Sequence, residues 1–211
     1  MPLQNRVTPL AEIVADPARG LMMGNRGGAL HAHDRTLGAR RWVSRQWICC
    51  VLQFNDRRRS VMVPGRYTEL FFLDEATALA AGHRPCFECR RADAMLFAQL
   101  WTGTCLKENR ARAAAIDLAL HAERLDRHGR QRRHPIDLDD LAAGSMYLDP
   151  EEALPWLVLD THILRWTPAG YRDPRSRPSG RMVAALTPPR IIAVLNSGYR
   201  PLLHETARVS R

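Results

Sequence analysis

Two cysteines three positions apart, Cys86 and Cys89, are the residues of this chain whose spacing best suits chemistry. They follow Pro85, which stiffens the backbone at the entry to a tight turn. A Cys-x-x-Cys turn lets both thiolates face one point, and this is half of the tetrahedral ligand set that zinc takes in proteins. The spacing therefore predicts a structural zinc site whose remaining ligands come from elsewhere in the chain.

Another cysteine and a histidine are expected to complete this site. Cys49 and Cys50 are neighbours in a strand-like stretch, so their side chains should point to opposite faces of the strand. We favour Cys50, because the alternate residues on its face, from 48 to 54, are apolar and should turn inward. The alternative is a metal-free fold in which Cys50 is a small buried hydrophobic residue. The candidates for the missing ligands are Cys49, Cys50, His31, His33 and His83, of which Cys50 and His83 are preferred.

A second group of polar residues, His31, His33 and Asp34, lies in a glycine-rich stretch that we expect to be an ordered loop. Alternate histidines beside an aspartate can bind a metal, or a carboxylate can orient one of them as a general base. This pattern defines an alternative function, a metal- or histidine-dependent phosphodiester hydrolase. The chain has no nucleophile elbow, phosphate loop or His-Glu-x-x-His pattern to support other catalytic classes.

Arginines form the third constellation, and they dominate a formal net charge of +9. Clustered cations favour a polyanionic partner, because counterions are released from the phosphates that they contact. Arginine forks also bind phosphate bidentately. We therefore predict a nucleic-acid partner, with DNA favoured over RNA. The expected contacts are Arg57, Arg58, Arg59, Arg90, Arg91, Arg130, Arg132 and Arg133.

Residues 68–90 carry the cysteine turn on recognisable local structure. Asp74 suits a helix N-cap, residues 75–81 are mostly strong helix formers, and Gly82 can end the helix in a left-handed conformation. The pattern predicts a strand, then a short capped helix, then the turn of Cys86 and Cys89.

This stretch resembles the second half of the metal-binding domain at the N-terminus of Ada-type DNA alkylation-repair proteins. In that family a Phe-rich strand leads to a helix that ends in Ala-Ala-Gly, followed by Arg-Pro-Cys-x-x-Cys. The resemblance implies a zinc-binding module linked to DNA repair or processing. The family takes its other two ligands from a Cys-x-x-x-Cys before the strand, whereas residues 57–67 here contain no cysteine or histidine. The matching residues are Phe71, Phe72, Ala80, Ala81, Gly82, Arg84, Pro85, Cys86 and Cys89.

The rest of the chain predicts an α+β fold in two parts. Residues 42–54, 61–63 and 67–73 are strand-like and should form a small antiparallel or mixed sheet, with a short helix before them at 10–15. Helices are expected at 92–101 and 108–125. From residue 135 onward, short strands predict a β-rich C-terminal portion, with an irregular loop at 172–180 and a closing helix at 188–196. We predict one domain at 1–134 and a second domain or subdomain at 135–211.

Cysteine usage and hydropathy bear on location. Five cysteines and no export signal favour reduced thiols or metal ligands over a disulfide framework. No apolar run approaches the length that crosses a bilayer, so we expect a cytoplasmic protein without a membrane partner. The favoured function is nucleic-acid binding with a structural zinc, and a non-catalytic scaffold protein is a further alternative.

Overall fold

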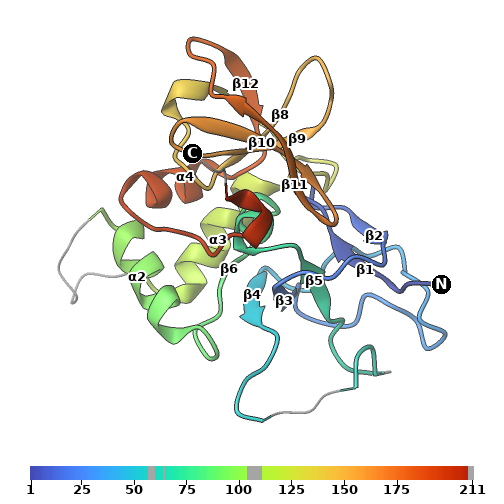
Figure 1. Ribbon diagram of the computed structural model, residues 1–211. Coiled ribbons are helices and arrows are strands. Elements are labelled where there is room, and N and C mark those ends of the chain that lie inside the picture. Colours follow the sequence, from blue (N-terminus) through green and yellow to red (C-terminus); the bar gives the residue numbers. More distant parts are fainter. Residues whose placement is uncertain (57–59, 64, 104–110, 209–211) are drawn as a thin grey trace.

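The computed structural model describes residues 1–56, 60–63, 65–103 and 111–208 of the chain (Figure 1). In these residues, two six-stranded sheets and four α-helices form the α+β fold that the sequence predicts. The N-terminal sheet and the C-terminal sheet lie on either side of the short helix α1, while the longer helices gather at one flank. None of the helices in the described part has the length and apolar character needed to span a bilayer.

The N-terminal sheet is mixed, with the strand order β2-β1-β5-β3-β4-β6. Strand β3 lies antiparallel to both β4 and β5, whereas β4 and β6 are parallel. Gly24 in β3 is required by this packing, because a Cβ atom there would lie 2.1 Å from the carbonyl oxygen of Ile48. The strands are β1 (Gln4–Val7), β2 (Ile13–Ala15), β3 (Met22–Asn25), β4 (Ile48–Val51), β5 (Leu70–Phe72) and β6 (Arg84–Pro85).

Helix α1 (Glu75–Ala80) occupies the centre of the molecule and is buried along its whole length. Asp74 caps it as predicted, since its carboxylate accepts a hydrogen bond of 2.9 Å from the amide of Thr77. Its small side chains let it approach both sheets: Ala78 packs with the N-terminal sheet, and Ala76 and Ala80 pack with the C-terminal one. The helix is followed by Gly82 in the left-handed conformation.

The C-terminal sheet is antiparallel throughout, with the order β11-β10-β9-β8-β12-β7. This confirms the β-rich C-terminal portion. The 3-10 turn η2 (Glu205–Ala207) packs beside β11, where the amide of Tyr171 donates to Thr206. The strands are β7 (His134–Asp137), β8 (Met146–Leu148), β9 (Pro155–Val158), β10 (His162–Thr167), β11 (Gly170–Ser176) and β12 (Met182–Ala185).

Three longer helices share one hydrophobic cluster at the flank of the molecule. They are α2 (Arg91–Trp101), α3 (Ala113–Arg124) and α4 (Pro189–Asn196), and η1 (Leu138–Asp140) precedes β8. Leu79 of α1, Phe97 of α2, Ile116 of α3 and Val194 of α4 all belong to this cluster. The strands of the C-terminal sheet begin at residue 134, but this cluster contains residues from before and after that position. The division into two domains stays a prediction.

Several predicted elements differ from the structure. The strand predicted at 42–54 is confined to β4, and residues 61–63 form a turn. The helix predicted at 10–15 is wrong, because the segment contains β2, paired with β1. The loop predicted at 172–180 is also wrong over most of its length, since β11 pairs with β10 despite its proline and arginines. An edge strand tolerates such residues, because only one of its sides must be hydrogen-bonded.

Candidate metal centre

The pairing of β4 with β6 brings three cysteines together. Cys49 lies opposite Pro85 in the parallel register, and the amide of Cys86 donates to the carbonyl of Cys49 at 2.9 Å. This places Cys50, the next residue of β4, beside the start of the cysteine turn. The turn closes where the amide of Arg90 donates to the carbonyl of Cys86 at 3.1 Å, and it leads directly into α2.

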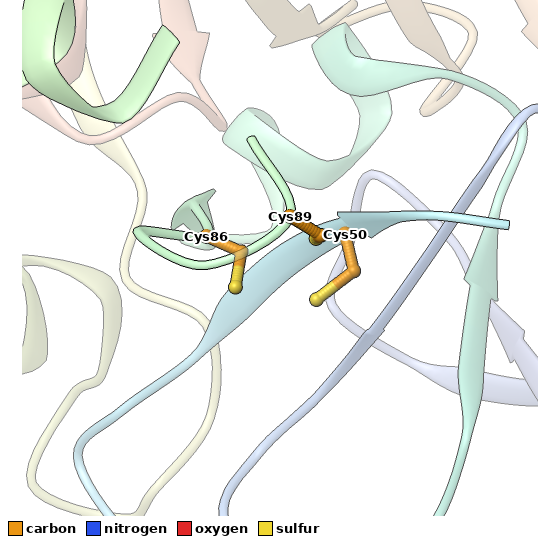
Figure 2. Close-up of side chains that lie close together, drawn as sticks. All are labelled: Cys50, Cys86 and Cys89. Carbon is orange, nitrogen blue, oxygen red and sulfur yellow. The ribbon is translucent and has the colours of Figure 1, made fainter. Parts of the chain in front are cut away.

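The sulfur atoms of Cys50, Cys86 and Cys89 all lie within 4.8 Å of one another. Figure 2 shows the three side chains, one from β4 and two from the turn. Cys50 and Cys86 are each 7% exposed, and Cys89 is partly exposed. Three converging thiols of this kind can hold a metal ion. In the described residues they are the one group of at least three His, Cys, Asp or Glu side chains with such spacing.

Hydrogen bonding favours the thiolate form in the turn. The Cys50 thiol lowers the pKa of Cys86 to about 5 by hydrogen bonding to it, and backbone amides of the turn act in the same direction. The amide of Glu88 donates to the Cys86 sulfur at 3.4 Å. Hydrogen bonding with Cys50 also lowers the pKa of Cys89, while the pKa of Cys50 is raised by its two neighbours. A cation at the centre would stabilise all three thiolates.

Cys49 points to the opposite face of β4, as the alternation of a strand predicts. It is fully buried in the core of the N-terminal sheet, and burial is the main reason that its pKa is raised. Of the two neighbours, Cys50 is the one that lies with Cys86 and Cys89, but the reason given for preferring it is wrong. The inward face of β4 is that of Cys49, whereas the alternate residues from 48 to 54 line a groove.

This groove has a volume of about 410 Å³ and includes all three cysteines in its wall. Much of the remaining lining is apolar, from Met23 and Phe71 on the neighbouring strands to Leu52 and Val61 beyond β4. Leu52 and Val61 are exposed at 49% and 40%. Sequence reasoning missed the groove, because residues from segments far apart in the sequence build it. A metal on the three sulfurs would therefore lie beside a partly apolar hollow.

His83, the preferred fourth ligand, is not brought to the cysteines. Its ring packs between Trp47 and Phe72, with ring centroids at 5.1 and 4.7 Å, and its Nε2 accepts from Arg26 at 3.3 Å. Burial, together with the neighbouring charge of Arg26, holds the pKa of His83 well below its usual value. The structure thus corrects this prediction: His83 is a neutral core histidine. The two-residue strand β6 separates it from Cys86.

The His31, His33 and Asp34 loop does not assemble a site. The His31 ring bonds to Thr68 and to the carbonyl of Gln4, and burial lowers its pKa. The Asp34 carboxylate accepts from both the amide and the hydroxyl of Thr36, which shapes the local turn. His33 is exposed. In the described part of the chain, these residues do not form a metal-binding group, and the geometry gives the hydrolase no support.

The predicted arginine contacts divide into four groups. The structure corrects the prediction that Arg90 contacts nucleic acid. This side chain is only 8% exposed, and its guanidinium pairs with Glu75 and Asp93. Arg91 is exposed at the start of α2. Arg57, Arg58 and Arg59 lie outside the described residues. The last group is exposed beside α3: Arg130, Arg132 and Arg133.

Arg130 and Arg132 belong to a tight turn at residues 125–132, which we call the basic turn, and Arg133 directly follows it. Asp126 shapes it by accepting from the amides of His128 and Arg130, and Leu125 pairs with Gln131. A surface hollow of about 540 Å³ lies here, lined by Leu125, Asp126, Arg127, His128, Arg130 and Arg132. The ring of Trp42 packs against Gly129, so an aromatic side chain lies beside this surface.

Comparison of the chain with protein-family models, with curated proteins and with solved structures finds no match. The likeness of residues 68–90 to Ada-type domains is thus a resemblance of that segment.

Proposed function

We propose that this protein binds zinc through Cys50, Cys86 and Cys89. The observation that carries the proposal is the convergence of three sulfur atoms within 4.8 Å, from two segments far apart in the sequence. Thiolates are ligands that zinc prefers, and two of the three cysteines are nearly buried, which suits a structural site. The ion would join β4 to the turn that begins α2.

The experiment measures zinc per chain by elemental analysis of protein purified from zinc-supplemented medium. We expect about one zinc per chain in the parent, and a loss of most of it in Cys86→Ser. The matched control is Cys49→Ala, which removes a buried cysteine on the opposite face of the same strand and should retain the metal. A parent that purifies without zinc and gains none on dialysis against it would refute the proposal.

We further propose that the basic turn contacts the phosphates of a nucleic acid, with DNA as the favoured partner. Support comes from the exposed arginines around the hollow, from the half-buried Trp42 beside them and from the net charge of +9. Each neutralised phosphate contributes about 0.9 to the slope of log affinity against log salt on duplex DNA. Replacing arginines that contact phosphates should therefore reduce the salt dependence of the affinity, and this identifies the binding surface.

The test replaces Arg130, Arg132 and Arg133 together by glutamine and measures affinity for duplex DNA and for RNA of the same sequence at several salt concentrations. We expect a slope reduced by about 2 to 3. The charge-matched control replaces Arg172, Arg175 and Arg190, which are exposed on β11 and α4, and should leave the slope unchanged. Absence of binding by the parent at moderate salt would favour the scaffold alternative.

A further inference from the structure

We infer that the metal held by Cys50, Cys86 and Cys89 keeps one coordination position open to the adjoining groove, and that this position takes a neutral nitrogen donor carried on an apolar body. An aromatic heterocycle related to imidazole is the chemical class that fits. The inference rests on the proposed zinc site and adds to it an exchangeable ligand and the chemistry of that ligand.

The number of donors favours an open coordination position. Zinc in proteins takes four ligands, and sites with three protein ligands leave the fourth position for water or another molecule. Among the residues that the structure describes, no fourth histidine, cysteine or carboxylate joins the three sulfurs. Since all three cysteines belong to the wall of one groove, a metal resting on them receives its fourth ligand from the groove side.

The charge of the site favours a neutral ligand. Three thiolates and a divalent ion carry a net charge of −1, and the described lining of the groove adds the buried carboxylate of Glu69 but no lysine or arginine. Glu69 is only 4% exposed and accepts from the amide of Met62 at 2.8 Å. A second anion placed here would be repelled at short range, because the partly buried wall screens charge poorly. A neutral donor avoids this cost.

The shape and polarity of the groove favour a ligand with an apolar body. Its volume of about 410 Å³ suits a small organic molecule, whose sites span roughly 300–1,000 Å³. Leu52 and Val61 are large apolar side chains left exposed at its rim, and Phe71 is a half-buried ring within it. A ligand with an apolar body would remove this surface from water, while its donor atom reached the metal.

The test loads the protein with cobalt(II), because its visible absorption bands report the coordination geometry and the bound ligands. Charge-transfer absorption from the three thiolates shows whether the site takes the metal, and this tests the proposed site separately. Imidazole, 1-benzylimidazole, benzyl mercaptan and acetate are then titrated. We expect 1-benzylimidazole to shift the visible bands with one-to-one saturation and to bind at least about tenfold more tightly than imidazole.

Variants test separately whether the apolar groove binds the ligand and whether the carboxylate of Glu88 binds the metal. Leu52→Asp, at the rim of the groove, should remove most of the advantage of the benzyl group while cobalt uptake persists. Leu96→Asp is the matched control, because Leu96 is 44% exposed on α2 and lies outside the groove lining. Glu88→Gln should leave the cobalt spectrum unchanged.

Three results would overturn the inference with the metal site intact. A cobalt protein whose bands do not respond to either nitrogen donor has no open position. Tighter binding of benzyl mercaptan or acetate than of 1-benzylimidazole would refute the neutral donor. A changed spectrum in Glu88→Gln would assign the fourth position to this carboxylate.

Discussion

Arg90 forms a buried ion pair with Glu75, at 2.7 Å between a guanidinium nitrogen and a carboxylate oxygen. Arg90 directly follows Cys89 of the candidate metal centre, and Glu75 is the first residue of the central helix α1. The same carboxylate accepts from the hydroxyl of Tyr199 at 2.7 Å and from the amide of Leu202 at 2.9 Å. The cysteine turn, α1 and the C-terminal segment therefore meet at one buried charge.

Replacement of Arg90 by methionine should destabilise the fold and weaken metal binding. It leaves the Glu75 carboxylate buried without its cation, a change that costs about 3–5 kcal/mol. Urea unfolding measures the loss of stability, and competition with a zinc chelator measures the loss of metal affinity. Arg91→Met is the control, since Arg91 is the next residue and is exposed.

The double variant Glu75→Gln with Arg90→Met separates the buried charges from the hydrogen bonds of Glu75. It removes both charges and keeps a side-chain oxygen that can accept from Tyr199, so its loss of stability should be smaller than that of Arg90→Met alone. Equal stability of Arg90→Met and Arg91→Met would contradict the role of the pair.

Gly82 should tolerate no side chain, for two separable reasons. Its φ of +78° disfavours any L-residue, and a Cβ atom would lie 2.7 Å from Cδ of the buried Arg124. Gly103 offers the matched control, because its φ of +68° carries the same strain while no atom of the described residues lies within 4 Å of the added carbon. We expect Gly103→Ala to cost about 1 kcal/mol and Gly82→Ala about 1–3 kcal/mol more.

Thermal or urea unfolding of both glycine variants provides the measurement. Equal losses of stability would show that Arg124 yields to the new methyl group. A larger loss at Gly82 would show that the guanidinium is held firmly over Trp47, where it lies 4.1 Å from the ring centroid.

The stability of the protein should fall on mild acidification because of His83. Burial and Arg26 lower its pKa in the folded state, so below the unfolded pKa of about 6.5 the unfolded chain binds a proton that the folded chain does not. This contribution to stability is present above pH 6.5 and is lost as the pH falls. Between pH 7.5 and 5.5 the loss amounts to roughly 1.4 kcal/mol.

His83→Gln checks this prediction, since glutamine can still accept from Arg26 but does not titrate. Urea unfolding of parent and variant at the two pH values should show a smaller pH dependence in the variant. His33→Gln is the control at an exposed histidine and should match the parent. A pH dependence unaffected by His83→Gln would contradict a role for this ring, and the difference between the variants removes any shared effect of metal release.

Local signals in the sequence predicted the central helix well. The N-cap Asp74, the run of helix formers and Gly82 each specify their own backbone within a few residues, and α1 has the expected bounds within one residue. The same locality explains why the Cys86 and Cys89 turn was predictable. Both sulfurs belong to one short segment whose geometry proline and hydrogen bonding set.

Long-range pairing could not be predicted in the same way. Cys50 reaches the turn only because β4 and β6 pair in parallel in a particular register, and two-residue β6 gives no sequence signal of its own. Arg90 and His83 were assigned to a nucleic-acid surface and to the metal because their partners, Glu75 and Trp47, are distant in sequence. Burial of a side chain depends on such distant partners. The local sequence around an arginine or a histidine therefore does not show whether that residue is exposed.

The parallel pairing of β4 and β6 has a consequence for chain connectivity. An ion on Cys50 and Cys86 would close the intervening polypeptide into a loop in the folded state, and because the site exists only when the chain is folded, its binding free energy adds to the free energy of unfolding. A protease cut within that interval would leave two fragments joined by the sheet and also by the ion, so a chelator should weaken their association.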